Sequence, residues 1–314
     1  MSAPRQPLRI TLLAGGRSPE REVSLESGRC VTQALRLRNH LVSVVDPAEC
    51  RLCESVLFPC DVVFPMVHGV GGEDGLLQRE LQDLRLPFVG SDAAASALTF
   101  DKIATRCHLQ RAGLPIPPGF HAADVEGREA IAAAAEALGY PIVIKPAAQG
   151  SSVGVTVVND AAKLPDALDL AFSFGARIVV EQFISGRELT VPVILGQAYP
   201  GIEIQPAHGW YDYRAKYLDD QTRYLVDPPD MPVQAADLAL AACRACGVAG
   251  ISRVDFRADA SGRCFILEIN TIPGMTSHSL VPMSAAARGI SPGELCENVL
   301  RAAIAAGNMQ RRSA

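Results

Sequence analysis

The feature of this sequence that most restricts its fold is a pair of alternating segments, residues 253–256 (RVDF) and 267–270 (LEIN). They flank residues 259–262 (DASG), which are typical of a tight turn, so together they predict a β-hairpin. Side chains alternate between the two faces of a strand, so each segment has one polar and one apolar face. We expect the apolar faces to lie in a core, with the members Val254, Phe256, Leu267 and Ile269.

The polar face of this hairpin predicts a site for a hard metal ion. If the last two residues of the turn form a two-residue loop, Asp255 lies opposite Glu268. The same register places Arg253 opposite Asn270, and a four-residue loop keeps all four on one face. Two facing carboxylates repel each other unless a cation lies between them. Because Mg²⁺ prefers a few carboxylates completed by water and phosphate oxygens, we expect it at Asp255, Glu268 and Asn270. The alternative is a surface hairpin with scattered charges.

The composition indicates a globular protein of two or three domains. The chain has 314 residues, of which 48% are hydrophobic and 20% charged, and this length is sufficient for substantial cores. Its net charge of −5 gives no support to nucleic-acid binding. The apolar run 10–14 is too short for the core of a signal peptide, and no run of about 18 apolar residues predicts a membrane span. We therefore expect a cytoplasmic protein without a nucleic-acid or membrane partner.

Nine cysteines include two C-x-x-C pairs, Cys50 with Cys53 and Cys243 with Cys246, which resemble half-sites for zinc. The pairs are far apart in the sequence, and the second lies in the Ala-rich, helix-like segment 235–245. We therefore expect reduced thiols rather than zinc ligands or disulfides.

The first hundred residues predict a doubly wound α/β domain. Strand-like segments at 9–14, 41–45 and 62–64 alternate with helical segments. A helix is expected to begin after the cap residue Ser18, with Pro19 at its first position. The glycine pair in the preceding turn does not continue into G-x-G-x-x-G, so NAD binding is not expected.

Two further units are predicted downstream. The first contains a helix at 101–111, a stiff connector at 113–119, a helix at 128–138 and a strand at 140–145. The second runs from about residue 185 to the end of the chain. The expected domains are therefore residues 1–97, 98–184 and 185–314.

The glycine- and serine-rich segment 145–154 (KPAAQGSSVG) is expected to join two antiparallel strands, 141–145 and 155–158. Such a loop can fold over a polyphosphate with its amides and hydroxyls, and Lys145 at the strand end adds positive charge. The chain has only four lysines, Lys102, Lys145, Lys163 and Lys216, and three of them lie in motifs, which favours a need for a compact ammonium group at those three positions. Chance in a small sample is the alternative.

Further candidates for nucleotide and substrate contacts lie between the serine-rich loop and the hairpin. Glu181 at the exit of an apolar strand can meet an adenine edge, and Glu188 just past the next turn can accept hydrogen bonds from ribose hydroxyls. We interpret the aromatic segment 210–217 as a lid over the site, in which Lys216 reaches phosphates and Tyr217 faces the substrate. A small satellite core is the alternative for this segment.

With these motifs, the chain resembles the D-alanine–D-alanine ligases, a family of the ATP-grasp superfamily. The resemblance covers nearly the whole chain and rests on GGRSPEREVSL (15–25), HGVGGEDG (68–75), DK (101–102), the serine-rich loop, YDYRAKY (211–217), RVD (253–255) and EINTIPGMTSHSLVP (268–282). It implies an N-terminal α/β domain that binds substrate, followed by two α+β ATP-grasp subdomains that clamp ATP. It also implies a homodimer.

The resemblance implies an ATP-dependent ligation of two D-alanines through an acyl phosphate, for peptidoglycan precursors. For the phosphates of ATP, the implied contacts are Lys102, Lys145 and Lys216, with Ser152 in the loop that covers them. For the nucleoside, they are Glu181, Gln182 and Glu188. Two Mg²⁺ ions, which Mn²⁺ can replace, are implied to bind at Asp255, Glu268 and Asn270. For the first D-alanine, the implied contacts are Glu20 and His68, and for the second substrate Ser279. Arg253 and the amide of Gly274 are implied to stabilise the oxyanion. A hydrogen-bonded pair, Ser151 and Tyr217, is implied to link the serine-rich loop to the lid.

Two alternatives are open at this point. A D-alanine–D-lactate ligase has the same architecture, but in the family a tyrosine at the place of Tyr217 accompanies the dipeptide product and a phenylalanine the depsipeptide. A nucleotide-binding module without ligase activity predicts loss of the metal ligands, all of which are present. The residues also leave open which group deprotonates the incoming ammonium, for which the Ser151–Tyr217 pair is a candidate.

Overall fold

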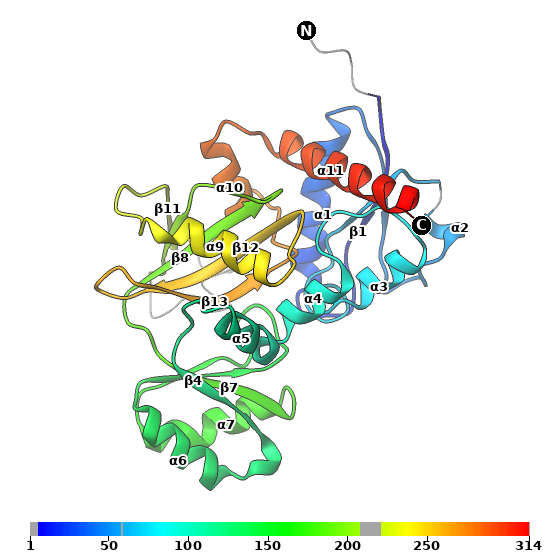
Figure 1. The fold of residues 1–314 in the computed structure, drawn as a ribbon. Helices are drawn as coiled ribbons and strands as arrows, with labels where there is room; N and C mark the ends of the chain where they lie inside the picture. The colour runs from blue at the N-terminus through cyan, green and yellow to red at the C-terminus, as the bar shows by residue number, and fades with distance from the viewer. Residues whose placement is uncertain (1–5, 58, 208–220, 314) are drawn as a thin grey trace.

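The computed structural model describes residues 6–57, 59–207 and 221–313. In these residues the strands form three separate sheets, each with its own helices (Figure 1). No helix in the described part of the chain combines the length and the apolar character needed to cross a lipid bilayer. All nine cysteines carry free thiols.

The first sheet is parallel, with its strands in the order 2-1-3 along the chain. Its elements are β1 (Arg9–Leu13), α1 (Arg21–Arg36), β2 (Leu41–Val45), α2 (Glu54–Leu57), β3 (Val62–Pro65) and α3 (Leu76–Asp83), followed by α4 (Ala93–Phe100). Side chains of β1 alternate between faces, so Leu12 enters a core with α1 and Leu13 a separate core with α2 and α3. Helices therefore cover both faces, and the predicted doubly wound α/β domain is confirmed.

Helix α1 begins two residues later than the sequence predicts. The predicted start, with Ser18 as cap and Pro19 as first helical residue, is wrong, because the residue before the helix is Glu20. The Ser18 hydroxyl instead donates to the carbonyl of His68 at 2.7 Å and accepts from the amide of Glu20 at 3.2 Å. The turn before α1 is thereby tied to the loop after β3, and Glu20 is held at the N-terminus of the helix.

The second sheet is antiparallel and lies at one end of the molecule (Figure 1). The chain enters through α5 (Lys102–Arg111) and forms β4 (Gly119–Ala123), α6 (Arg128–Leu138), β5 (Ile142–Pro146), β6 (Thr156–Val158), α7 (Leu164–Phe172) and β7 (Arg177–Gln182), in the spatial order β4-β7-β5-β6. Helices α6 and α7 cover one face, where Ile144 and Val180 are fully buried. Lys145 and Glu181 follow these residues and face the other way. The serine-rich loop joins β5 to β6, as predicted.

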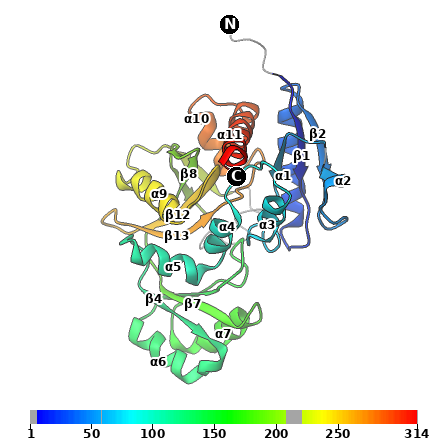
Figure 2. The ribbon, with the colours of Figure 1, turned by 45° about the vertical axis from the view of Figure 1, so that its right-hand side comes forward.

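The third sheet contains the hairpin. Its elements are β8 (Arg187–Ile194), β9 (Gln197–Ala198), β10 (Ile202–Gln205), β11 (Arg223–Val226), α9 (Gln234–Ala245), β12 (Ile251–Ala258) and β13 (Cys264–Asn270), with the order β11-β10-β8-β12-β13 and β9 paired to β8. Helix α9 covers the apolar face of this sheet, and Leu109 of α5 packs into the same core. Helix α5 therefore lies between the second and third sheets, as Figures 1 and 2 show from two directions.

The strand register of the hairpin agrees with the prediction, although the loop at its tip is longer than the two residues assumed. Arg253 pairs with Asn270, and Asp255 pairs with Glu268. The loop at the tip has three residues rather than two, since the amide of Asp259 bonds to the carbonyl of Arg263. This longer loop shifts the pairing by one residue, and a bulge next to Asp255 shifts it back.

The bulge changes which residue enters the core. Phe256 pairs with Ile266, so Leu267 is the extra residue of the bulged strand. Ile266 is 1% exposed and belongs to the core beneath α9, whereas Leu267 is only partly buried. The expectation that Leu267 lies in the core is therefore wrong, while Val254, Phe256 and Ile269 are buried as predicted.

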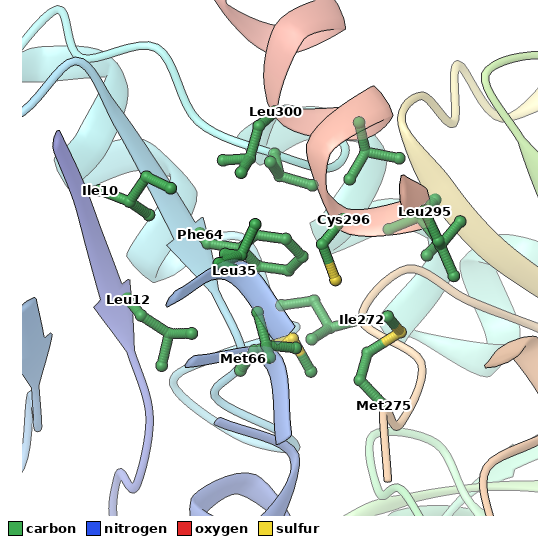
Figure 3. Close-up of a cluster of buried hydrophobic side chains, with 14 of the residues drawn as sticks. Ile10, Leu12, Leu35, Phe64, Met66, Ile272, Met275, Leu295, Cys296 and Leu300 are labelled. Carbon is green, nitrogen blue, oxygen red and sulfur yellow. The ribbon is translucent and has the colours of Figure 1, made fainter. Parts of the chain in front are cut away.

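The end of the chain returns to the first sheet. After α10 (Leu280–Ala287), helix α11 (Pro292–Ser313) packs against α1. Figure 3 shows Leu295, Cys296 and Leu300 of α11 beside Phe64 of β3 and Met275 of the loop after β13. Residues from both ends of the sequence thus form one core, and this core fixes the first domain against the third sheet.

The bulge makes a testable prediction about two neighbouring residues. Ile266→Ala should lower the free energy of unfolding by about 2–5 kcal/mol, because it opens a cavity in a closed core. Leu267→Ala should lower it by less than about 1.5 kcal/mol, because this side chain is already partly in water. Urea denaturation of the two variants measures the difference. A larger loss for Leu267→Ala than for Ile266→Ala would contradict the bulge.

Candidate active site

A cavity of about 860 Å³ lies where the three sheets meet. Its walls come from the start of α1, the loop after β3, the start of α5, the serine-rich loop, and the strands and loops around the hairpin. Many of the residues singled out from the sequence line it, namely Glu20, His68, Lys102, Ser151, Arg253, Glu268, Asn270, Gly274 and Ser279. Segments more than 250 residues apart in the sequence therefore converge on one space.

Other residues singled out from the sequence are placed elsewhere. The residues Lys145, Ser152, Glu181, Gln182, Glu188 and Asp255 are not in the wall of this cavity. Lys216 and Tyr217, with the predicted lid at 210–217, lie outside the described residues. The cavity also has walls that the sequence did not suggest, including Glu73, Phe100, Tyr224, His278 and Met283.

The carboxylates of the hairpin are balanced by two cations. Asp255 accepts two hydrogen bonds from Arg253, at 2.8 and 2.7 Å, and a third from the hydroxyl of Thr190 at 2.6 Å. Glu268 forms an ion pair with Lys102 at 3.2 Å. Both carboxylates lie on the same face of adjacent strands, so a cationic environment is needed there, as expected from the sequence.

The donor atoms at the hairpin suit a hard cation. Asp255 and Glu268 are cross-strand neighbours, and Asn270 lies two residues further along the same strand. Oxygen ligands of this type fit Mg²⁺ better than a soft metal. No group of three or more His, Cys, Asp or Glu side chains arranged for a metal ion occurs within residues 6–57, 59–207 and 221–313. A metal at the hairpin would therefore need further ligands, from water or from a bound substrate.

The serine-rich loop reaches back to the first domain. The hydroxyl of Ser151 donates to the carboxylate of Glu20 at the start of α1. Ser151 and Ser152 both have positive φ angles, 48° and 60°, a conformation that is uncommon for residues other than glycine. Such strained backbone often occurs at ligand-binding loops. The contact with Glu20 was not expected from the sequence, and the expected partner Tyr217 lies outside the described residues.

Two buried ionisable groups lie beside Glu20. Burial lowers the pKa of His68 to about 4, and the nearby charge of Arg253 acts in the same direction. The Nε2 atom of His68 is buried and has no hydrogen-bond partner among the described residues. Burial raises the pKa of Glu73 to about 8, helped by the neighbouring Glu20 carboxylate. Burial therefore favours the uncharged form of both side chains in this corner.

The sequence motifs gave no role to Glu73, although its position in the glycine-rich loop could have indicated one. It belongs to the segment 68–75 (HGVGGEDG), in which only His68 was given a role. Its carboxylate accepts a hydrogen bond from the amide of Gly69 at 2.7 Å, so the segment folds back on itself. An acidic residue inside a glycine-rich loop that follows a buried strand is a recognisable sign of such a turn.

The two carboxylates expected near the nucleoside each have an arginine partner. Glu181 is buried between Lys145 and Arg106, with 2.7 Å between Arg106 Nη1 and Glu181 Oε2. Glu188 pairs with Arg257 at 3.2 Å, and Arg257 also donates to the carbonyl of Ile184 in the connection between β7 and β8. Neither arginine was identified from the sequence, because each lies about 70 residues from its partner and in no recognisable motif.

The opposite wall of the cavity is formed by the start of α10. Ser279 is the residue before the helix, and its hydroxyl accepts from the amide of Thr276 at 2.9 Å. A Cβ atom on Gly274 would lie only 2.8 Å from this hydroxyl, so a glycine is needed for the close approach. The N-terminus of a helix favours negative charge. This wall can therefore accept carboxylate or oxyanion groups, and Arg253 lines the same cavity.

Comparison with known proteins identifies relatives over nearly the full length. A family model described as "D-ala D-ala ligase C-terminus" matches residues 109–301. A D-alanine–D-alanine ligase from Gloeobacter violaceus is 42% identical over 300 residues, which are 93% of this chain and 98% of that protein. D-alanine–D-alanine ligase B from Chromobacterium violaceum is 44% identical over 295 residues, which are 93% of this chain and 96% of that protein.

The fold points to the same relatives. The crystal structure of a D-alanine–D-alanine ligase from Bacillus anthracis complexed with ATP matches with a TM-score of 0.84 and 28% identity, over 98% of this chain and 100% of that chain. The resemblance seen in the sequence motifs is therefore confirmed, and so is the α/β and ATP-grasp fold class. With its three sheets, its shared cavity and these relatives, the chain belongs to the D-alanine–D-alanine ligase family, whose members are ATP-dependent ligases.

Proposed function

We propose that this protein joins two D-alanine molecules to D-alanyl-D-alanine, with ATP activating the first carboxylate as an acyl phosphate, and so provides a precursor of peptidoglycan. The observation that carries this proposal is the composition of the cavity. One wall has an acidic group and a neutral imidazole, another has the acidic hairpin and Lys102, and a third has Arg253, Gly274 and a helix N-terminus. These groups suit an amino acid, a polyphosphate and an oxyanion respectively.

The nucleotide is proposed to lie between the second and third sheets. Lys102 and Lys145 would contact phosphates together with Lys216, while the serine-rich loop with Ser152 would cover them. Glu181 and Gln182 are proposed to contact adenine, and Glu188 to contact ribose. These assignments are supported by the position of Lys145 and Glu181 on the sheet face that looks toward α5.

Asp255, Glu268 and Asn270 would hold Mg²⁺, or Mn²⁺ in its place. Bound there, two such ions would neutralise charge on the phosphoryl group during its transfer. The protein itself contributes an acidic pair whose counterions, Arg253 and Lys102, are already in position. Both cations are then available to other anions in the cavity when metal ions balance the carboxylates.

The first D-alanine is proposed to bind at Glu20 and His68. The Glu20 carboxylate would accept its ammonium group. His68, whose Nε2 atom has no partner among the described residues, lines the same cavity and would lie near the substrate carboxylate. Burial and the neighbouring Glu20 carboxylate raise the pKa of Glu73, which disfavours two negative charges in this corner at the same time.

The second D-alanine is proposed to bind with its carboxylate at Ser279. Arg253 and the amide of Gly274 would stabilise the oxyanion that forms when its amine attacks the acyl phosphate. Ser151 and Tyr217 would link the serine-rich loop to the lid, which must exclude water because acyl phosphates hydrolyse. The Ser151–Tyr217 pair is also our proposal for the group that helps the ammonium to lose its proton.

The organisation of the protein completes the proposal. Residues 1–97 would form the substrate domain, and residues 98–184 and 185–314 the two halves that clamp ATP. We also propose a homodimer located in the cytoplasm, since peptidoglycan precursors are built from cytoplasmic ATP and amino acids. Size-exclusion chromatography with light scattering would test the dimer.

The decisive experiment is release of ADP from ATP and Mg²⁺ with D-alanine, L-alanine, D-serine and D-lactate offered singly and in pairs. We expect turnover with D-alanine alone and D-alanyl-D-alanine as the product in mass spectrometry. A depsipeptide as the main product at neutral pH would assign the protein to the D-alanine–D-lactate ligases instead. No ADP release with any pair would refute the ligase proposal.

The acidic hairpin gives the first prediction for this reaction. Glu268→Gln should reduce ADP release to below about a tenth of the normal rate, because the site loses a charge that a metal clamp on the phosphates requires. The thermal midpoint should change little, since Glu268 is only partly buried. Glu129→Gln, on the exposed surface of α6, is the matched control and should be fully active. A Glu268→Gln enzyme with nearly normal turnover would remove the hairpin from the mechanism.

The burial of His68 gives a prediction about pH. Below pH 6.5 the unfolded chain binds a proton at this side chain, while the folded protein does not until about pH 4. Stability should therefore fall as the pH falls from about 6.5 to about 4, and His68 should contribute about 2 kcal/mol of this loss between pH 7 and pH 5. Urea denaturation of the protein and of His68→Asn at both pH values measures this contribution. Parallel pH profiles would show that His68 is not buried as a neutral group.

A further inference from the structure

Arg106 is a largely buried cation that has no role in the proposed reaction so far. It lies on α5, and its Nη1 atom is 2.7 Å from Oε2 of Glu181, which is 75 residues away in the sequence. The Arg106 side chain is 13% exposed and that of Glu181 only 3%. Its Nη2 atom donates to the carbonyl of Pro117 at 2.9 Å. A paired charge at this depth has little water to stabilise it, so its partner is important.

The position of α5 explains how Arg106 reaches Glu181. Figures 1 and 2 both show α5 between the sheet of β12 and β13 and the sheet of β4 and β7. Leu109 packs on the first of these sheets, and Arg106 points to the second. At the start of the helix, Asp101 forms an ion pair with Arg177 of β7 at 2.8 Å. Helix α5 is therefore attached to β7 at two points.

Glu181 is held from several directions. Its Oε1 atom contacts Lys145, and its Oε2 atom contacts Arg106. Its backbone is approached closely by Gly119 of β4, where a Cβ atom would lie 2.7 Å from Glu181 Cα. Each carboxylate oxygen thus has its own cation, and the strand that carries the carboxylate has little freedom to move.

The charges at this point do not balance. Two cations, Lys145 and Arg106, face one carboxylate, so the cluster carries an excess positive charge. An anionic nucleotide can take up this excess if it draws Lys145 to its phosphates, because the Arg106–Glu181 pair then remains neutral. Without Arg106, Glu181 would have Lys145 alone as its counterion and would compete with the nucleotide for it.

We propose that Arg106 is a positioning residue of the nucleotide site, which neutralises and orients Glu181 so that Lys145 is available to the phosphates of ATP. This inference rests on the nucleotide roles proposed above for Glu181 and Lys145. Arg106 does not touch the nucleotide; it acts through the carboxylate that it holds. It also joins α5, which carries Lys102, to the strand that carries Glu181, so that two contacts to the nucleotide are positioned together.

The test compares Arg106→Gln with the unchanged protein in ATP binding and in steady-state kinetics. We expect Arg106→Gln to raise both the Kd and the KM for ATP at least about tenfold, as for loss of one partner from a buried charge pair. The KM for D-alanine should stay within about twofold. Arg106→Lys, which restores the charge, should recover most of the ATP affinity. Arg111→Gln, at an exposed position on the same helix, is the matched control and should behave like the unchanged protein.

A double variant separates the proposal from a merely structural role. If Glu181 competes for Lys145 once Arg106 is gone, adding Glu181→Gln to Arg106→Gln should cause no further loss of ATP affinity. Losses that simply add, equal rises in the KM values for ATP and D-alanine, or an unchanged KM for ATP would each overturn the proposal. Arg106→Met, which keeps the apolar stem, replaces Arg106→Gln in the same comparison if the glutamine variant does not fold.

Failure of this inference can be told apart from failure of the proposed function. ADP release by the unchanged protein with D-alanine tests the function and does not involve Arg106. ATP binding measured by equilibrium dialysis without D-alanine tests Arg106 and does not depend on ligation. An active enzyme whose ATP affinity is unaffected by Arg106→Gln would refute the inference and leave the function intact.

Discussion

The balance of charge across the hairpin of β12 and β13 is the constraint on which the site depends. Asp255 and Glu268 lie opposite each other on adjacent strands, where their repulsion must be offset. The protein offsets it with Arg253 from the same strand and Lys102 from α5. The cation on α5 adds an ion pair to the apolar packing of Leu109 on the third sheet, so the charge balance of the hairpin and the position of α5 in the cavity wall are linked. The same principle recurs at Glu181 and Glu188, where arginines from other elements provide the balance.

Local patterns in the sequence were sufficient for most of the elements and for much of the site. Strand alternation, cap residues and the hairpin register depend on neighbouring residues, which is why β2, α5, α6 and the pairing of Asp255 with Glu268 could be predicted. The errors also have local causes. The turn at 259–263 is one residue longer than assumed, and the bulge that compensates for it exchanges Leu267 for Ile266 in the core. Ser18 does not cap α1, because its hydroxyl donates a hydrogen bond to the carbonyl of His68.

The parts that could not be predicted depend on contacts between distant segments. Nothing near Arg106 or Arg257 in the sequence shows that either will meet a carboxylate about 70 residues away. The protonation of Glu73 depends on burial and on Glu20, which belongs to another loop. Such features follow from the way domains pack, and one sequence contains no periodic signal for that. The roles of the residues at 210–217 stay predictions, because that segment lies outside the described residues.

The packing of α11 on the first sheet has a consequence for the folding of the protein during its synthesis. The face of the sheet that carries Ile10, Leu12 and Phe64 also packs against Leu295 and Leu300, which are made more than 230 residues later (Figure 3). Domains usually fold in order as they leave the ribosome. Here β1, β2 and β3 are synthesised early, and α1 covers part of this face with Val31 and Leu35, but the contacts from α11 are added only after most of the chain has been made. The core of the first sheet can therefore reach its final packing only after residues 295–300 have been synthesised.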